Sequence, residues 1–260
     1  IGLQGEPDEA QHDRGCKAHD GRERIADVLR VVKDEVGDGL TQTSDGIFVY
    51  TGSAPTVSLG QWVQLNGVVA EFNTGATGNT ITAANTVTEL TGISNLTVKA
   101  SGRSVNPVVV SLPATPAELE RVEGMLVTIN GPLTVNQNFY QGRFGQLTLA
   151  VGGRLETPTN RHRPGTPQAL ALADENARRR IILDDGRSTQ NPNPTPYLQA
   201  DGVPRAGDTV ASITGVIDYG LAALSNAGPG DYKIHPTVAP VFSVANPRLA
   251  APPVSPAASA

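Results

Sequence analysis

The stretch LGQWVQLNGVVAEF, residues 59–72, carries apolar side chains at alternate positions, with Gln64 between Val63 and Leu65. This period of two is typical of a β-strand with one buried face. Gly67 interrupts the pattern, and a glycine inside a strand often marks a bulge or a sharp bend. We therefore expect a long, bent strand that turns the corner of a small barrel.

A similar pattern returns as AGDTVASITGVIDYG at residues 206–220. Each stretch has a glycine, an apolar strand, and a second glycine followed by two apolar residues. The recurrence predicts two similar small barrels, with this strand at an equivalent place in each. The 28 glycines, the 20 prolines and the short runs rich in Val, Ile and Thr favour the same all-β class.

A chain of 260 residues is long enough for two such β domains. The sequence predicts a polar, poorly ordered start (1–24), a first β module (25–112), a linker with a short helix (113–122), a second β module (123–245) and a Pro/Ala-rich tail (246–260). The linker helix is predicted from Thr115 and Glu118, which have the spacing of a capping box.

Three other segments carry local predictions. Apolar residues at i, i+3, i+4 and i+7 predict a helix over 22–35, although Val31 and Val36 also suit a strand. Residues 79–90 have strand character. Residues 191–196 contain too many prolines for a central strand.

The net charge of −5 argues against a surface that binds nucleic acid over its whole extent, but it permits a local basic face. The only cysteine is Cys16, so no intramolecular disulfide can form. No apolar run reaches the roughly 18 residues that span a bilayer, so we expect no membrane span. The chain starts at Ile1 without a signal sequence, which predicts either a cytoplasmic protein or one whose signal has been removed.

An acidic, glycine-containing loop covers residues 34–46, with Asp34, Asp38 and Asp45 as candidate ligands. Oxygen-rich turns of this kind can hold Ca²⁺. Their spacing does not match the twelve-residue helix-loop-helix pattern, and Asp and Gly are also what any tight turn uses. A Ca²⁺ site and an ordinary turn therefore both remain open.

Residues that could carry out catalysis do not form a recognisable set. Asp184 and Asp185 are adjacent on a predicted strand, so they should point to opposite faces, which favours a simple strand-to-turn junction. His162 and His235 lie in polar segments next to prolines and have no carboxylate at ligand spacing. We expect both histidines to be solvated surface residues.

Arginine is concentrated between two apolar runs at residues 125–129 and 181–183, where no lysine occurs. If residues 178–180 form a strand, Arg178 and Arg180 share one face and can grip a phosphate together. Aromatic side chains lie near by in sequence, and aromatics beside arginines on a β surface can hold single-stranded nucleic acid. A solvated or internally paired face is the alternative. The predicted nucleic-acid-binding residues are Arg143, Phe144, Arg154, Arg161, Arg163, Arg178 and Arg180.

Five blocks of sequence, in this order and spacing, resemble the region ahead of the catalytic domain in large secreted bacterial endonucleases of the ExeM/NucH type. The blocks are SDGIFVYTG (44–52), ELERVEGMLVTI (118–129), GRFGQLTLAVGGRLETPTN (142–160), NARRRIILDDG (176–186) and GDTVASITGVIDYG (207–220). The resemblance covers residues 34–248. It implies two OB-fold-like barrels in tandem, secretion, and a C-terminal endonuclease/exonuclease/phosphatase domain, which needs a divalent metal and is missing from these residues.

The sequence departs from that family between residues 8 and 33, where a first strand is expected, so we expect the first barrel to be incomplete. The resulting hypothesis is a non-catalytic module that contacts the DNA phosphate backbone, or positions a domain, in a secreted endonuclease. The alternative is an extracellular structural β protein, or assembly subunit, that makes protein–protein contacts. Catalysis by these residues themselves is not expected, because no catalytic site is recognisable.

Overall fold

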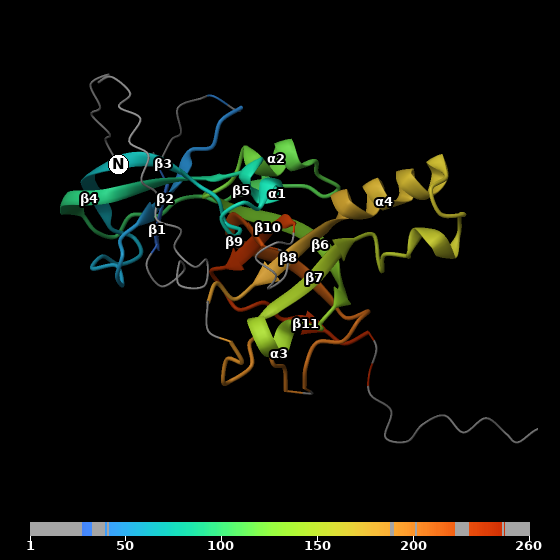
Figure 1. Ribbon diagram of the computed structural model, residues 1–260. Coiled ribbons are helices and arrows are strands. Elements are labelled where there is room, and N and C mark those ends of the chain that lie inside the picture. The colour runs from blue at the N-terminus through green and yellow to red at the C-terminus, as the bar shows by residue number, and fades with distance from the viewer. Residues whose placement is uncertain are drawn as a thin grey trace, which may run out of the picture.

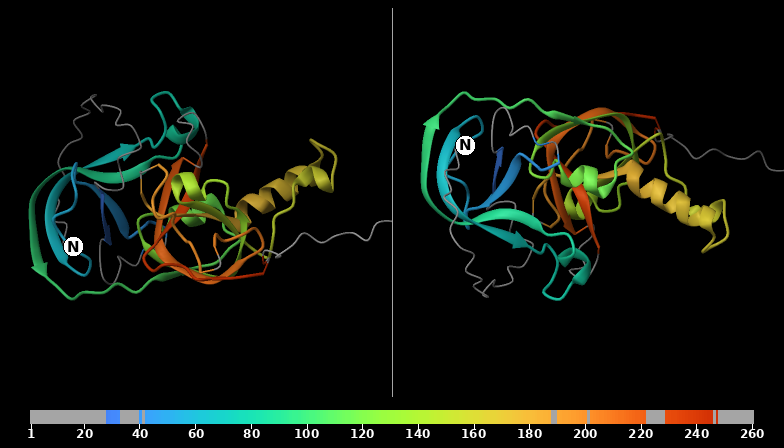
Figure 2. Two further views of the ribbon diagram at one scale, coloured as in Figure 1. Left: turned by 90° about the horizontal axis from the view of Figure 1, so that it is seen from below. Right: turned by 90° about the horizontal axis from the view of Figure 1, so that it is seen from above.

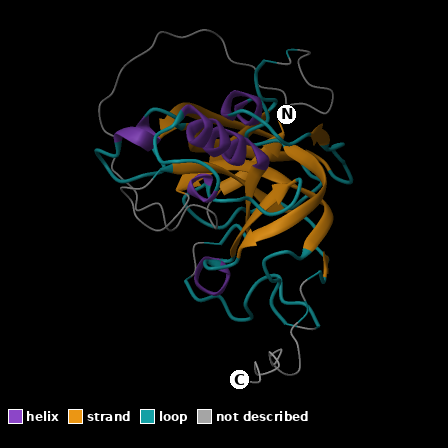
Figure 3. Ribbon diagram, turned by 90° about the vertical axis from the view of Figure 1, so that its right-hand side faces the viewer, coloured by secondary structure: helices purple, strands orange, loops and turns teal. Residues whose placement is uncertain are grey.

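The computed structural model describes residues 28–32, 40, 42–187, 190–200, 202–221, 229–245 and 247 (Figure 1). The protein is mostly β with a few short helices, as the sequence predicts. Figure 3 shows the strands gathered in the middle and the helices around them. The predicted start (1–24) and, apart from Pro247, the predicted tail (246–260) lie outside the described residues. No helix in the described part is long and apolar enough to cross a membrane.

The first sheet has four strands in the order β1-β2-β4-β3. Strand β2 pairs antiparallel with β1 and parallel with β4, which in turn pairs antiparallel with β3. Figure 2 shows these strands curving on one side of the molecule, with α4 on the opposite side. The strands are β1 (Val28–Val32), β2 (Gly46–Tyr50), β3 (Trp62–Phe72) and β4 (Val87–Ala100).

The second sheet has seven strands in the order β11-β9-β10-β8-β7-β6-β5, and β9 also pairs with β6. Its strands are β5 (Val108–Val110), β6 (Leu126–Gln137), β7 (Gln146–Val151), β8 (Arg180–Asp184), β9 (Thr209–Leu221), β10 (Gly230–Pro236) and β11 (Phe242–Ser243). The helical elements are α1 (Thr80–Ala83), α2 (Pro116–Glu120), α3 (Gln141–Phe144), the 3₁₀ turn η1 (Pro158–Asn160) and α4 (Pro167–Arg179).

The larger core is formed mainly by the second sheet. Leu133, Leu149 and Leu183 are among its fully buried side chains. Phe48 and Val87 of the first sheet also belong to this core, so the two sheets share buried surface. A smaller core of Val49, Val63, Leu65 and Leu90 lies within the first sheet.

Three local predictions are confirmed. Thr115 caps α2 and Glu118 reaches back to the Thr115 backbone N–H at 2.7 Å, which is the predicted capping box. The pairing of β3 with β4 shifts register on both sides of Asn66, next to Gly67, where a bulge or bend is predicted. Residues 191–196 form no strand, also as predicted.

Two other local predictions from the sequence are wrong. Within the predicted helix over 22–35, residues 28–32 form β1, because pairing with β2 along five residues outweighs the local helical spacing. The predicted strand over 79–90 is broken in its first half by α1, where the Asn79 side chain accepts hydrogen bonds from the N–H groups of Ile81 and Thr82. An asparagine that caps a turn in this way competes with strand pairing.

The two strands that contain the recurrent sequence pattern occupy equivalent positions in the two sheets. Strands β3 and β9, which contain the two similar stretches of sequence, each pair antiparallel with the strand that follows them in the chain. In both sheets, that following strand pairs parallel with a third strand, as β4 does with β2 and β10 with β8. A fourth strand pairs antiparallel with this third strand in each sheet, β1 with β2 and β7 with β8, so the two sheets share an arrangement of four strands.

Candidate functional site

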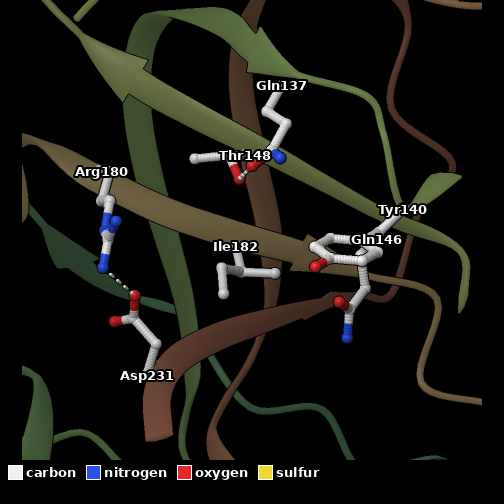
Figure 4. A pocket seen from close by; sticks show the side chains of 7 residues that line it. All are labelled: Gln137, Tyr140, Gln146, Thr148, Arg180, Ile182 and Asp231. Carbon is white, nitrogen blue, oxygen red and sulfur yellow. Dashed lines mark hydrogen bonds and ion pairs between the residues drawn. The ribbon is translucent and has the colours of Figure 1, made fainter. Parts of the chain in front are cut away.

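A shallow hollow of about 80 Å³ lies on the outer face of the second sheet, where strands β7, β8 and β10 run side by side. Its floor is formed by side chains that alternate with the buried core residues of these strands. Figure 4 shows that Arg180 and Asp231 lie at one end of the hollow and that Tyr140 and Gln146 lie at the other. The lining residues are Gln137, Tyr140, Gln146, Thr148, Arg180, Ile182 and Asp231.

The aromatic end of the hollow is built by the turn at residues 138–145, which contains α3. The ring of Tyr140 packs edge-on against Phe139, with 5.0 Å between ring centroids, and at a tilt of 39° against Phe144, with 5.7 Å between centroids. Phe144 is buried, whereas Phe139 is 75% exposed. Arg143 lies over the Phe144 ring, 5.1 Å from its centroid. The turn therefore presents one exposed ring and one half-buried ring beside a guanidinium group.

The polar end of the hollow is an ion pair. Nη2 of Arg180 donates to Oδ2 of Asp231 at 2.7 Å. Burial raises the pKa of Asp231, and the charge of Arg180 opposes this rise. One guanidinium nitrogen is thus directed to Asp231, and the guanidinium has further N–H donors that a ligand can use.

A buried charge cluster continues along the same outer face, at Asp184, Lys233, His235 and Asp218. The Asp184 carboxylate accepts hydrogen bonds from Gln146 Nε2 at 2.6 Å, Lys233 Nζ at 2.9 Å and the Gly186 N–H at 2.9 Å. Burial acts to raise the pKa of Asp184, but the charges of Lys233 and His235 and the hydrogen bonds hold it below its usual value. Gln146 joins this cluster to the hollow.

His235 is part of this cluster, so the prediction that it is a solvated surface residue is wrong. The residue is 3% exposed, with Nε2 3.0 Å from Oδ2 of Asp218 and Nδ1 3.8 Å from Oδ1 of Asp184. The alternation of buried Tyr232 and Ile234 in β10 does place Lys233 and His235 together on the outer face. Sequence alone does not reveal that this part of the outer face is covered.

Asp185 and Tyr197 lie beside the cluster, and each has a buried oxygen, Oδ2 and Oη, that makes no hydrogen bond. Burial is the main reason why the pKa of Asp185 rises to about 6. The pKa of Tyr197 is also raised, by burial and by the two neighbouring carboxylates. The Asp185 N–H donates to the carbonyl of Gly145 at 3.2 Å, which connects this group to the end of the aromatic turn.

The structure does not place the predicted arginine side chains together on one face. Arg178 and Arg179 end helix α4 and Arg180 begins β8, so the alternation expected of a three-residue strand does not apply. Arg178 pairs with Asp174 at 2.9 Å, while Arg180 pairs with Asp231. The two guanidinium groups are therefore held by different carboxylates rather than gripping one phosphate.

The remaining predicted residues are divided between two places. Arg143, Phe144 and Arg180 lie at or beside the hollow. Arg154, Arg161 and Arg163 are exposed on the segment between β7 and α4, and Arg161 pairs with Glu156. Figure 1 shows this segment at the outer end of α4, projecting from the sheet. Sequence reasoning missed Gln137, Gln146 and Thr148, although the alternation in QLTLAV places Gln146 and Thr148 on the face opposite the core.

The predicted Ca²⁺ loop is only partly described. Asp34 and Asp38 lie outside the described residues, and Asp45 directly precedes β2. In the part of the chain that the structure describes, no group of three or more His, Cys, Asp or Glu side chains is arranged to hold a metal ion. The Ca²⁺ site stays a prediction.

Comparison with known families gives a match to the second sheet. Residues 116–246, about half of the chain, match the family described as "Domain of unknown function (DUF8508)". The chain belongs to this family. No curated protein and no solved structure matches it. The DUF8508 region begins at the first residue of α2 and ends just after β11, so it contains every residue that lines the hollow.

Proposed function

We propose that the DUF8508 region is an OB-like barrel and that the first sheet is an incomplete copy of it. Hydrogen-bonded pairing runs from β6 through β7, β8, β10 and β9 back to β6. The pair β8–β10 is parallel and the other four pairs are antiparallel. A closed five-stranded cycle with one parallel pair supports an OB-like barrel. The first sheet repeats four of these five strands, which supports an incomplete barrel.

We further propose that the chain is a non-catalytic module that binds single-stranded DNA on the outer face of β7, β8 and β10. The observation that carries this proposal is the hollow between the aromatic turn and the Arg180–Asp231 pair. It lies on the second and third strands of the proposed barrel and next to the turn between the first two. OB-fold proteins bind oligonucleotides and oligosaccharides on this face.

The chemistry of the lining fits a nucleotide. Phe139 and Tyr140 offer ring faces for base stacking, which tolerates any sequence. Gln137, Gln146 and Thr148 supply donors and acceptors for base edges or sugar hydroxyls. Arg143 and the remaining N–H groups of Arg180 can hold phosphate oxygens. The hollow has no nucleophile paired with a general base, so binding is the role that its residues support.

In the proposed setting, this module precedes the catalytic domain of a secreted bacterial endonuclease of the ExeM/NucH type and holds the DNA strand for it. The order of the five resembling sequence blocks supports this setting. The module itself would not need a metal, and cleavage would require the catalytic domain with its divalent ion.

Fluorescence anisotropy with a labelled oligo(dT) of about twelve nucleotides tests the proposal. We expect binding that weakens as salt rises from about 20 to 200 mM, because phosphate contacts release counterions. Arg180→Ala should weaken binding about tenfold. Arg163→Ala is the matched control, since Arg163 is exposed on the projecting segment, and it should change binding less than about twofold. Undetectable binding at low salt, or equal effects of the two variants, would contradict the proposal.

A further inference from the structure

The aromatic turn ends at Gly145, and the carboxyl group of Asp185 lies directly against this residue. Gly145 has the left-handed backbone conformation, with a φ of 66°, and its N–H donates to the carbonyl of Gln141 at 2.9 Å. A Cβ built on Gly145 would overlap the carboxyl group of Asp185. The Asp185 N–H donates in turn to the carbonyl of Gly145 at 3.2 Å. Asp185 therefore occupies the space that a side chain at the end of the turn would fill.

Neutral hydrogen bonds tie the same turn to the segment that follows β8. The Asn191 N–H donates to the carbonyl of Arg143 at 2.9 Å. The buried side chain of Gln141 donates to the carbonyl of Pro196, also at 2.9 Å. Amide and carbonyl groups do not titrate near neutral pH. These bonds therefore differ from the contact at Asp185, whose carboxyl group can gain or lose a proton.

The carboxyl group of Asp185 lacks the hydrogen-bond donors that a buried charge needs. Oδ1 accepts from the Arg187 N–H at 3.1 Å, whereas the buried Oδ2 accepts no hydrogen bond from the described residues. A buried oxygen without a donor costs more free energy when it is charged than when it is neutral. Burial is also the main reason why the pKa of Asp185 rises to about 6. The contact with Gly145 therefore suits the neutral carboxyl group.

The charged and titratable groups that face Asp185 act in both directions. Asp184 raises the pKa of Asp185 further, whereas Arg187 and Lys233 of β10 lower it. Burial raises the pKa of Tyr197, in the segment after β8, so its hydroxyl is neutral near pH 7. The pKa of Asp184 is held below its usual value despite burial, by Lys233 above all. Near pH 6 the proton therefore binds to Asp185 rather than to Asp184.

We propose that Asp185 is a positioning residue for the aromatic turn, holding it at the end of β8 in its neutral form and loosening it in its charged form. A charged carboxylate gains hydration by moving away from Gly145, and the end of the turn then loses its support. The turn carries Phe139, Tyr140 and Arg143. The consequence for ligands rests on the proposed DNA-binding function: affinity for single-stranded DNA should fall as the pH rises through about 6.

Hydrogen exchange of the chain without ligand tests the positioning role by itself. The amides of Phe144 and Gly145 donate within the turn and report on its opening. Once the intrinsic effect of pH on exchange is removed, their protection in the wild type should fall about fivefold between about pH 5 and pH 7.5. Asp185→Asn has the same shape without the charge, so protection should change less than about twofold. Asp174→Asn, the same change at a more exposed carboxyl group of α4, should behave like the wild type.

Two results would overturn the positioning role. One is constant protection of the wild-type turn across this pH range, and the other is an equal fall in the wild type and in Asp185→Asn. Circular dichroism at both ends of the range checks that the variants keep their fold. Asp185→Ser serves as a second neutral variant should Asp185→Asn fail to fold.

Anisotropy with labelled oligo(dT), at constant ionic strength, then tests the consequence for binding. Wild-type affinity should fall about fivefold more than that of Asp185→Asn over the same pH range. Asp231, at the end of the hollow away from Tyr140 (Figure 4), also has a pKa raised by burial. Its effect on binding is common to both proteins, so the difference between them isolates Asp185.

The two experiments separate failure of the positioning role from failure of the DNA-binding proposal. If oligo(dT) binds at no pH, the proposed DNA-binding function fails, and hydrogen exchange of the free chain still decides whether Asp185 positions the turn. If oligo(dT) binds with the same pH dependence in the wild type and in Asp185→Asn, the DNA-binding function stands and the role of Asp185 in it is overturned.

Discussion

Gly46 and Gly124 face each other backbone to backbone where the two sheets meet. A Cβ built on Gly124 would lie 3.0 Å from the carbonyl carbon of Gly46, and one built on Gly46 would overlap the Gly124 carbonyl group. The hydroxyl of Ser44 donates to the carbonyl of Glu123 at the same place. The backbones therefore lie so close together here that a Cβ at either position would crowd the other backbone.

Gly46→Ala should lower the free energy of unfolding by about 2 kcal/mol or more, because the methyl group must push two backbones apart. Thermal or urea unfolding measures the loss. Gly142→Ala is the control, since a Cβ there meets nothing within 4 Å. If the two variants are equally stable, the contact between the sheets is looser than the structure indicates.

Lys233→Met should destabilise the protein by about 3 kcal/mol, because it leaves the buried Asp184 without its cationic partner. Arg178→Ala provides the comparison, since it breaks a more exposed ion pair with Asp174 within one helix. That change should cost only about 0.5 kcal/mol. Similar losses in urea unfolding would show that the Asp184 cluster is more solvated than its burial suggests.

Asp185 should make stability fall as the pH rises. Its pKa is about 6 in the folded protein and near 3.8 without the fold, so the folded state binds the proton more tightly. This contribution is fully present below about pH 4 and is lost as the pH passes 6. Because the carboxyl is half-buried and partly screened by water, the effect should be about 1 kcal/mol.

Thermal unfolding of Asp185→Asn between pH 4 and pH 7 measures this contribution. The variant should lose part of the pH dependence and gain stability relative to the wild type at pH 7. Asp231 also has a pKa raised by burial, so some pH dependence should persist. The assignment to Asp185 fails if the wild type and the variant give parallel curves across this range.

Phe139→Ala should weaken binding of oligo(dT) about tenfold without changing stability, because the ring is exposed and available for stacking. An abasic oligonucleotide of the same length separates stacking from phosphate contact. It should bind wild type and variant alike. Loss of affinity for both oligonucleotides would instead indicate that the substitution disturbs the turn that holds Tyr140.

Elements with local chemical signals could be predicted from the sequence. The Thr115–Glu118 spacing identified a cap, and Gly67 identified an irregularity in β3. Helix α4 was missed, although Thr166 and Pro167 form a recognisable helix start. Its side chains are mostly exposed, Leu170 among them, so the sequence shows no buried face at helical spacing.

The site was harder to predict because it depends on what covers an outer face. His235 and Asp184 lie on the side of their strands opposite the core, which sequence alternation assigns to solvent. Their burial comes from tertiary contacts that period-two alternation does not encode. The hollow likewise joins side chains from four separate segments, and only Arg180 among the predicted arginines lines it.

Arg179 closes the base of the projecting segment between β7 and β8. Its guanidinium donates to the carbonyls of Val151, at 3.0 and 2.9 Å, and of Gly152, at 2.8 Å. The two ends of residues 153–178 are therefore held together whatever lies between them. Because lengthening an anchored surface loop costs little entropy, this segment can change in length, or accept an inserted foreign domain, while the sheet beneath it stays the same.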